Sequence, residues 1–348
     1  MADVIGVRPQ LDGLRAVAMV GVLYVHFWNT TPSAEYVRVT LFLVISGFLI
    51  THILMSAKAK GGALTVQNFY IRRALRLFPA LFVIFIGAWL MDADGFRASA
   101  AWHLLPTSNI YFSRTEAMRP WVVAHLWSLN LLEQFYLLWP LVILFLSEKA
   151  LHVVVVLGIA GIAFLRANGD HLGVNYWYLT FVFSFDPILM GALAFLLQRH
   201  RPARDVMTNP ATIFLALAFV SSPLVLWEDF GHSDSYRFLS QPAVAVLVVG
   251  AFQGYSGPVG WMLQSPPVRF IAKISYGVYV YHLLAWYAVA QYFPTLYDKD
   301  LRTFVVMSTL TIALATVSYY AIELPVSRWK DAFPVRKPTV AAKRDQLA

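Results

Sequence analysis

Residues 38–56 read RVTLFLVISGFLITHILMS, and this stretch decides the class of fold. Only its first residue, Arg38, is formally charged, and its length is close to the ~20 residues that a helix needs to cross the hydrocarbon core of a bilayer. We therefore predict a membrane-spanning helix here. Similar stretches predict ten spans in all, near residues 11–28, 38–56, 76–91, 122–146, 150–166, 175–198, 209–228, 240–255, 270–293 and 301–323. The segment 98–112 is ambiguous and also fits a re-entrant or interfacial segment.

The composition agrees with a membrane protein. Of 348 residues, 59% are apolar and 13% are charged, whereas soluble domains carry about a quarter charged residues. The longest connections, 57–75 and 92–121, leave no room for a soluble catalytic domain. We predict one all-α, polytopic membrane bundle over residues 1–348. The absence of cysteine excludes a thiol nucleophile and a cysteine-ligated metal, and no metal is expected.

Charges between the predicted spans set the expected orientation. Alternate connections carry the basic residues Lys58, Lys60, Arg72, Arg73, Arg76, Arg199, Arg201, Arg204, Arg269 and Lys273. The other connections carry most of the acidic residues. Because basic loops stay on the cytoplasmic side, we predict that both termini are cytoplasmic and that residues 325–348 form a basic tail. The net charge of +8 then reflects topology and contact with membrane lipids, so no nucleic-acid partner is expected.

The first predicted span carries two candidate functional residues, Arg15 and His26. A spacing of eleven residues is about three turns, which places both on one helix face at ~16 Å along the axis. Ionisable groups inside a span are costly, so each is a functional hypothesis. His26 can act as a base near neutral pH, or it can be a packing histidine. Arg15 can contact a substrate, pair with Asp12, or extend to the interface.

Three arginines follow the second span, at Arg72, Arg73 and Arg76. In a helix Arg73 and Arg76 lie one turn apart on one side, where they can bind phosphate groups bidentately. The alternative is that they only set topology and contact lipid headgroups.

The fourth span begins HLWSLNLLEQFY over residues 125–136, which is unusually polar for a membrane helix. Its polar side chains must face the bundle interior. Burial of Glu133 in the membrane costs the most free energy among these side chains. Glu133 is therefore a candidate for orienting a base or acting as one. Polar residues also bind membrane helices to each other, which is the structural alternative.

Three weaker candidates remain. Asp186 precedes a proline within a span and is interpreted as structural. His282 in the ninth span is either a packing or a functional residue. Glu323 is expected to pair with Arg328 near the inner interface.

These residues, taken in order, resemble the acyltransferase-3 family of membrane proteins, which O-acylate bacterial surface glycans and related molecules. The resemblance covers nearly the whole chain. It rests on LDGLR at 11–15 with His26, FLVISGFLI at 42–50, Arg73-x-x-Arg76 with Pro79, HLWSL at 125–129 with EQFY at 133–136, ISYG at 274–277 with His282, and Glu323-x-Pro325.

The resemblance implies a membrane O-acyltransferase of the bacterial inner membrane with ten spans and cytoplasmic termini. It also implies acetyl-CoA or another acyl-CoA as donor, and a glycan or lipid-linked saccharide as acceptor. By resemblance, His26 is the catalytic base or acyl-handling residue with Arg15 as its partner, and Arg73 and Arg76 contact the CoA phosphates. The further residues expected around the donor are Arg72, Ser46, Trp127, Ser128, Tyr136 and His282.

The chain departs from the family pattern at two positions. Leu132 replaces the first of two adjacent acids in the fourth span, so only Glu133 can fill an acidic role. Phe185 stands where related chains often have an arginine before Asp186. Some relatives also carry a C-terminal hydrolase-like domain, whereas a short basic tail is expected here.

Two other functions fit the polar residues in the spans. A proton-coupled transporter or flippase of a glycan precursor or small acid also needs intramembrane His, Glu and Asp, although no paired interrupted helices are evident. A catalytically silent relative that scaffolds a glycan assembly complex is the third hypothesis, and the altered fourth span is its only support.

Overall fold

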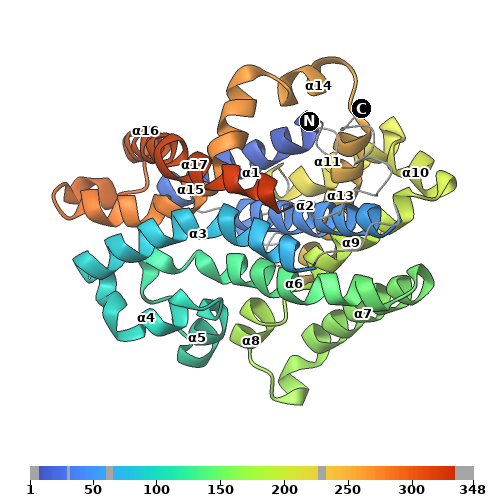
Figure 1. Cartoon of the computed structure of the whole chain (residues 1–348), viewed down its shortest axis with the longest axis horizontal. Helices are drawn as coiled ribbons and strands as arrows, with labels where there is room; N and C mark the ends of the chain where they lie inside the picture. The colour runs from blue at the N-terminus through green and yellow to red at the C-terminus, as the bar shows by residue number, and fades with distance from the viewer. Residues whose placement is uncertain (1–7, 30–31, 60–65, 226–232, 334–348) are drawn as a thin grey trace, which may run out of the picture.

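The computed structural model of the chain describes residues 8–29, 32–59, 66–225 and 233–333, and within these ranges every regular element is a helix. The first half contains α1 (Pro9–Phe27), α2 (Pro32–Ala59), α3 (Val66–Met91), η1 (Ala93–Gly95), α4 (Phe96–Leu104), α5 (Ser108–Thr115), η2 (Trp121–Val123), α6 (Leu126–Phe145) and α7 (Glu148–Leu172). The second half contains α8 (Tyr176–Phe181), α9 (Asp186–Gln198), α10 (Arg201–Met207), α11 (Pro210–Val225), α13 (Asp234–Gln253), α14 (Gly257–Leu263), α15 (Pro266–Ala290), η3 (Pro294–Tyr297), α16 (Leu301–Ser318), η4 (Tyr319–Glu323), α17 (Leu324–Arg328) and η5 (Trp329–Ala332). The prediction of an all-α bundle is therefore confirmed (Figure 1).

The helices are long and apolar enough to make this a multi-pass membrane protein. Among the described residues, seven helices meet the length and composition needed to cross a membrane, or eight if the bent pair of α10 and α11 forms one span. Helices α1 and α15 do not meet that test. Both carry polar residues on faces that the bundle buries, among them Gln10 of α1 and Ser275 and His282 of α15. The predicted total of ten spans and the cytoplasmic placement of the termini stay predictions.

Three boundaries differ from the expected ones. Helix α3 begins at Val66, ten residues before the predicted span, so much of the expected connection 57–75 is helical. The sixth predicted span is interrupted, because residues 182–185 separate α8 from α9. A bend of 55° also separates α10 from α11, so interrupted helices do occur, although none was evident from the sequence. The predicted tail begins with the short helices α17 and η5, and its residues 334–348 lie outside the described residues.

Two apolar cores hold the bundle together. One lies around α2, α6, α7, α9 and α13, and the other lies around α1, α3, α6 and α15. Phe42, Trp127 and Tyr136 pack against both cores and join them. Large apolar side chains such as Phe82 and Phe145 remain exposed on the outside of the bundle, at 67% and 77%, as expected of surfaces that face lipid.

The closest helix packing involves α2 and α9. A Cβ atom on Gly47 would collide with the backbone carbonyl of Ile188, and one on Gly191 would collide with the carbonyl of Val44. Glycine at both positions lets the two backbones touch, which is the usual way that membrane helices gain close van der Waals contact. This contact fixes the position of α2, which carries several residues of the candidate site.

The ambiguous segment 98–112 folds into two short helices, α4 and α5, separated at Pro106. Helix α5 packs against α6 and α8, α4 packs against α3 and α5, and α4, α5 and α8 lie at the lower edge of the bundle in Figure 1. They cover the predicted outward side of the bundle and contact the polar residues of α6.

Candidate active site

A cavity with four arginines in its lining lies between α1, α2, α3, α6 and α15, where the two apolar cores meet. Its lining residues are Arg15, Met19, Arg38, Val39, Phe42, Leu43, Ser46, Arg73, Arg76, Leu77, Ser128, Leu129, Leu132, Tyr136, Ser275, Tyr276 and Tyr279. Six residues expected at the site therefore meet in one space, and these are Arg15, Ser46, Arg73, Arg76, Ser128 and Tyr136. The cavity draws on helices that are far apart in the sequence.

Three guanidinium groups give one part of this cavity a strong positive charge. Arg15 pairs with Asp12 at 3.4 Å, which was one of the alternatives predicted for this arginine. The Asp12 carboxylate is 46% exposed. Arg73 stacks over the ring of Tyr136 with its Cζ atom 4.9 Å from the ring centroid. Arg76 completes the group. Asp12 pairs with Arg15 and Glu323 interacts electrostatically with Arg76, so two acids face three arginines, and this part of the cavity suits a ligand with negative charge.

Three histidines form a buried cluster close to the cavity. The ring centroid of His282 lies 4.8 Å from that of His26 and 4.9 Å from that of His125. Nδ1 of His282 lies 2.6 Å from the carbonyl oxygen of Tyr279, which assigns a proton to Nδ1. Within the described part of the chain, Nε2 of His282 has no hydrogen-bond partner.

Two cavity residues connect the lining to the histidines. Nη2 of Arg38 lies 3.1 Å from Nε2 of His26. The hydroxyl of Tyr279 lies 2.6 Å from the carbonyl oxygen of His125 and 2.7 Å from Oγ of Ser128. The cavity thus runs from the three arginines to groups that touch His26 and His125.

A lysine lies near His26. Nζ of Lys299, from the connection between α15 and α16, donates to the carbonyl oxygen of Val25 at 3.3 Å. Burial lowers the pKa of Lys299, and Glu35 opposes that shift. His26 therefore has a second basic side chain, Lys299, in its surroundings.

Four expected site residues lie elsewhere or have other partners. Glu133 accepts a hydrogen bond from Asn130 at 2.9 Å and has no hydrogen bond to His26 in the described structure. Arg72 donates to the carbonyl oxygen of Lys330 at 2.8 Å and does not line the cavity. Trp127 packs edge-on against Phe181, also away from the lining. His282 belongs to the histidine cluster and not to the group of arginines.

The polar side chains of α6 mainly hold the covering helices in place. Asn130 Oδ1 accepts the backbone N–H of Ser108 at 2.7 Å, and Gln134 donates to the carbonyl oxygen of Pro106 at 2.9 Å. These contacts support the structural alternative for the polar stretch 125–136. Glu323 also differs from expectation, because it accepts from Ser318 at 3.1 Å and makes no ion pair with Arg328 in the described structure.

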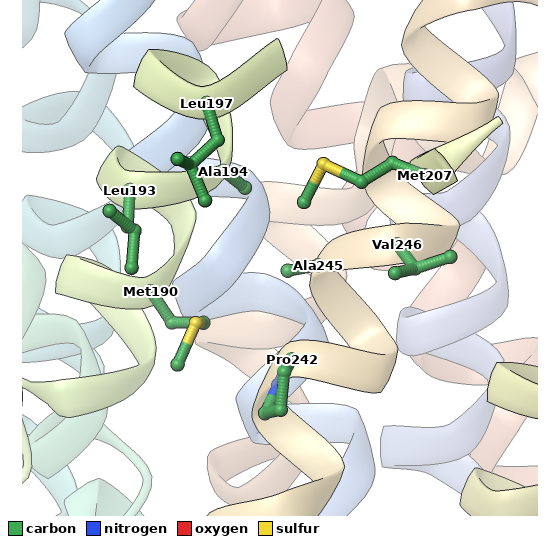
Figure 2. A pocket seen from close by; sticks show the side chains of 8 residues that line it. All are labelled: Met190, Leu193, Ala194, Leu197, Met207, Pro242, Ala245 and Val246. Carbon is green, nitrogen blue, oxygen red and sulfur yellow. The ribbon is translucent and has the colours of Figure 1, made fainter. Parts of the chain in front are cut away.

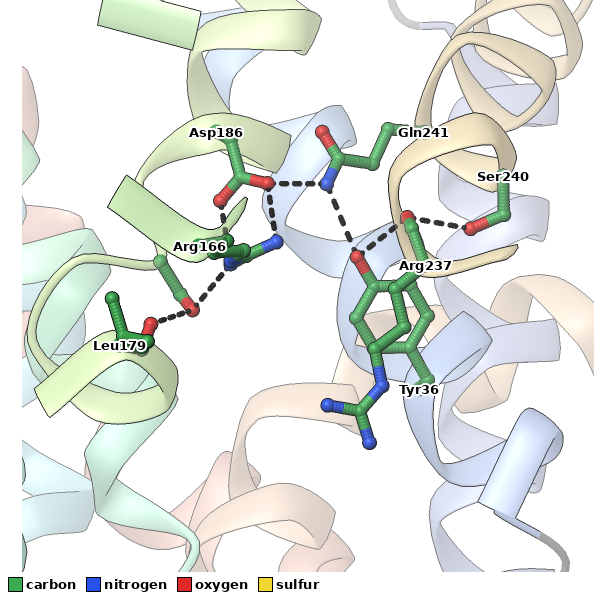
Figure 3. Close-up of polar contacts among 8 residues, drawn as sticks. Tyr36, Arg166, Leu179, Asp186, Arg237, Ser240 and Gln241 are labelled. Atoms are coloured by element: carbon green, nitrogen blue, oxygen red, sulfur yellow. Dashed lines mark hydrogen bonds and ion pairs between the residues drawn. The ribbon is translucent and has the colours of Figure 1, made fainter. Parts of the chain in front are cut away.

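Asp186 belongs to a separate buried network that the sequence did not predict (Figure 3). Arg166 from α7 contacts both carboxylate oxygens, at 2.8 and 2.9 Å, and also Ser184. Gln241 donates to the same carboxylate and to Tyr36. Arg166 of α7 thus pairs with this acid, and the network bridges the break between α8 and α9.

A second cavity contrasts with the first. It lies between α9 and α13, with Met207 of α10 at one side, and its lining is apolar throughout (Figure 2). It offers no group that could bind a phosphate or move a proton. Of these two cavities, only the one lined by arginines has groups that can bind a charged substrate.

Arg38, His125 and Tyr279 complete the site and were not among the expected site residues. The signal in the sequence was weak. Arg38 stands at the start of an apolar span, where a basic residue is ordinary, and only the packing of α1 against α2 brings it to His26. His125 begins the HLWSL motif and Tyr279 follows ISYG by two residues, but neither position alone indicates a role.

The fold and the cavity together define a class of protein: a multi-pass helical membrane protein with a guanidinium-lined internal cavity that leads to buried histidines. Sequence comparison gives the family. The acyltransferase domain of the acyltransferase-3 family matches residues 8–320, so the chain belongs to this family. No solved structure matches the chain.

Curated relatives cover most of the chain. A Staphylococcus aureus (strain COL) protein named "Putative O-acetyltransferase" is 28% identical over 352 residues, covering 91% of this chain and 57% of the relative. A Bacillus subtilis (strain 168) protein named "Putative peptidoglycan O-acetyltransferase" is 28% identical over 91% of this chain and 54% of its own length. The peptidoglycan O-acetyltransferase of Listeria monocytogenes is 26% identical over 92% of this chain and 56% of its own length. The chain thus spans about half the length of the curated relatives that it matches.

Proposed function

We propose that this protein is a membrane O-acetyltransferase that moves an acetyl group from cytoplasmic acetyl-CoA to a hydroxyl group of a cell-surface or exported glycan. We further propose that it resides in the bacterial inner membrane with both termini in the cytoplasm. Family membership and the names of the relatives support this activity, and those names make peptidoglycan the first acceptor to test.

One observation carries the proposal at the level of the site. A single cavity joins Arg15, Arg73 and Arg76 to Arg38, whose guanidinium contacts His26. CoA carries several phosphate charges at one end and its thioester at the other. The three arginines suit the phosphates, and the pantetheine arm is proposed to extend from them toward His26.

In the proposed reaction His26 is the general base. The acceptor hydroxyl oxygen attacks the thioester carbonyl carbon while its proton passes to His26. The tetrahedral intermediate then collapses, the C–S bond breaks, and the proton moves from His26 to the CoA thiolate. Glu133, expected to orient the base, hydrogen-bonds Asn130 instead, so His26 is proposed to act with Arg38 and His282 as its neighbours.

The absence of cysteine allows a direct test. Purified protein in nanodiscs is mixed with acetyl-CoA and soluble peptidoglycan fragments, and released CoA thiol is followed with a thiol reagent, to which the chain contributes no background. We expect His26→Ala to bind acetyl-CoA but to lose transfer by at least about 10²-fold, which is the usual contribution of a general base. Replacing Arg73 and Arg76 together by Gln should instead weaken acetyl-CoA binding.

Matched controls exist for both variants. His171→Ala changes an exposed histidine at the end of α7, and Arg201→Gln changes an arginine that is 85% exposed. Both should transfer acetyl groups at the wild-type rate. Full transfer by a folded His26→Ala protein would refute the assignment of the base. Glycan flux without acetylation in proteoliposomes would favour the transporter.

A further inference from the structure

Arg38 is a buried cation whose hydrogen-bonding capacity is only partly used. Its side chain is 7% exposed, and it lines the arginine-rich cavity. Its ion pair is with Glu35 at 3.5 Å, and that carboxylate is 51% exposed to solvent. Nε of Arg38 has no hydrogen-bond partner within the described structure. A buried polar group left without a partner is costly, which points to a ligand that completes it.

The contact between Arg38 and His26 has a chemical consequence. A guanidinium group can only donate hydrogen bonds, so Nε2 of His26 must accept across the 3.1 Å contact, and its proton lies on Nδ1. In this state the lone pair that a base needs is occupied. His26 becomes available as a base only when an oxygen atom of a ligand replaces Nε2 as the acceptor of this hydrogen bond from Arg38.

The position of Arg38 indicates which oxygen that is. Arg38 lines the same cavity as Arg15, Arg73 and Arg76, and it also touches the proposed base. In a CoA thioester held by its phosphates, the group that arrives between those arginines and the base is the acyl carbonyl. A carboxylate on the acceptor is the other oxygen that a guanidinium could bind.

We propose that Arg38 binds the carbonyl oxygen of the acetyl thioester, stabilises the oxyanion of the tetrahedral intermediate, and in doing so releases Nε2 of His26. This inference rests on the proposed acetyltransferase function. It assigns Arg38 as a catalytic residue that also keeps the base blocked until the donor is in place.

The proposed transfer begins when the donor displaces His26 from Arg38. Acetyl-CoA enters, and its carbonyl oxygen accepts hydrogen bonds from the unpartnered Nε of Arg38 and from the Nη2 group that had donated to His26. The acceptor oxygen forms a bond to the carbonyl carbon, its proton moves to Nε2 of His26, and the carbonyl oxygen becomes an anion beside Arg38. The intermediate re-forms the carbonyl and breaks the C–S bond, and the thiolate takes the proton from His26. Preorganised donors of this kind stabilise charge that develops only in the transition state.

The kinetic test uses Arg38→Gln, Arg38→Lys and Arg237→Gln in nanodiscs, with CoA thiol release as the readout. Arg237 is the matched control, because its Nε is also buried without a partner but it does not line the cavity. We expect Arg38→Gln to lower kcat by about 10²–10³-fold, as for loss of one oxyanion donor, with little change in KM for either substrate. Arg38→Lys should recover part of kcat, and Arg237→Gln should keep the wild-type kcat.

A binding test gives a readout besides activity. Acetyl-CoA is compared with S-ethyl-CoA, a thioether that lacks the carbonyl oxygen. Wild-type protein should bind acetyl-CoA more tightly than S-ethyl-CoA, and Arg38→Gln should remove that difference while leaving S-ethyl-CoA affinity unchanged. If Arg38→Gln does not fold, Arg38→Lys is measured in the same way, and its preference for acetyl-CoA should be reduced.

The contrary outcomes are distinct. Wild-type kcat in a folded Arg38→Gln protein would refute the role of Arg38 while leaving the acetyltransferase function intact. A raised KM for the acceptor with unchanged kcat would overturn the proposal in favour of an acceptor carboxylate. Failure of wild-type protein to bind either CoA compound would refute the proposed function and this inference together.

Discussion

At the scale of single residues, two buried arginines show how structural and functional charges differ. Arg166 gives two hydrogen bonds to Asp186 and one to Ser184, and the carboxylate also accepts from Gln241. Arg38 has one bond to a histidine, a longer ion pair to a solvated acid, and a free Nε within the described structure. In the first network both oxygens of the Asp186 carboxylate are bonded, and the network spans a helix break. The second is incomplete beside a cavity, which is where a substrate is expected.

A histidine outside the predicted spans gives a pH-dependent prediction. His103 of α4 is buried between Ser99 and Ser108, at 3.1 and 3.0 Å, and burial lowers its pKa to about 4. The unfolded chain protonates this histidine near pH 6.5, so between these values the unfolded state binds more protons and stability rises with pH. We expect up to about 3 kcal/mol of stability to be lost as the pH falls from 6.5 to 4.

The measurement is Tm against pH for the wild-type protein and for His103→Gln. The variant keeps a polar group at this position but cannot titrate, so its Tm should fall less steeply below pH 6.5. Parallel curves for the two proteins would show that His103 does not carry the dependence.

The sequence predicted part of the site for a physical reason. The spacing of Arg15 and His26 is a property of one helix, and so is the spacing of Arg73 and Arg76, so both pairs can be recognised without tertiary structure. The contact between Arg38 and His26 joins two helices, and the pair of Arg166 with Asp186 crosses a helix break. Such contacts depend on how helices pack together, and the spacing of residues along the chain does not reveal that packing.

At the scale of helices, the contact of α2 with α9 is the main constraint on the position of Ser46 and Arg38. Gly47→Ala places a methyl group against the carbonyl oxygen of Ile188. Both the methyl carbon and this oxygen are attached to helix backbones that cannot shift easily. We expect a loss of about 1–3 kcal/mol of stability, as for overpacking of a filled core, together with reduced transfer. The measurement is thermal unfolding in nanodiscs combined with CoA thiol release.

Gly161→Ala is the matched control for this prediction. A Cβ atom there meets nothing within 4 Å, because Gly161 of α7 is exposed. Alanine is the better helix former, so this variant should keep or raise the stability. Equal stability of Gly47→Ala and Gly161→Ala would contradict the role given to the contact of α2 with α9.

Helix existence was more predictable than helix limits. Among the described residues each predicted span is largely helical, because long apolar runs are a strong signal, while the end of the predicted span 209–228 lies outside the described residues. Hydropathy identified only the apolar part of α3, however, and missed the turn that carries Arg72 and Arg73. It also missed the break at 182–185, because the residues there are mostly aromatic and apolar and only the network around Asp186 defines the interruption.

At the scale of the whole molecule, the cavity is placed where two apolar cores meet, so its walls come from helices of both cores. Guanidinium groups gather in one part and the histidines lie beyond Arg38. If the termini are cytoplasmic, as predicted, Arg73 and Arg76 lie toward the donor and His26 toward the acceptor. The bundle would then catalyse a reaction between substrates on opposite sides of the membrane.

The most direct test of this account is acetyl transfer across a sealed membrane. Protein is reconstituted in proteoliposomes with a known orientation, radiolabelled acetyl-CoA is added on the side of Arg73 and Arg76, and peptidoglycan fragments are trapped on the other side. We predict that label accumulates on the trapped glycan, that His26→Ala abolishes this transfer, and that His171→Ala leaves it unchanged. Label that reaches the glycan equally well with His26→Ala, or glycan that crosses the membrane without acquiring label, would contradict the central claim.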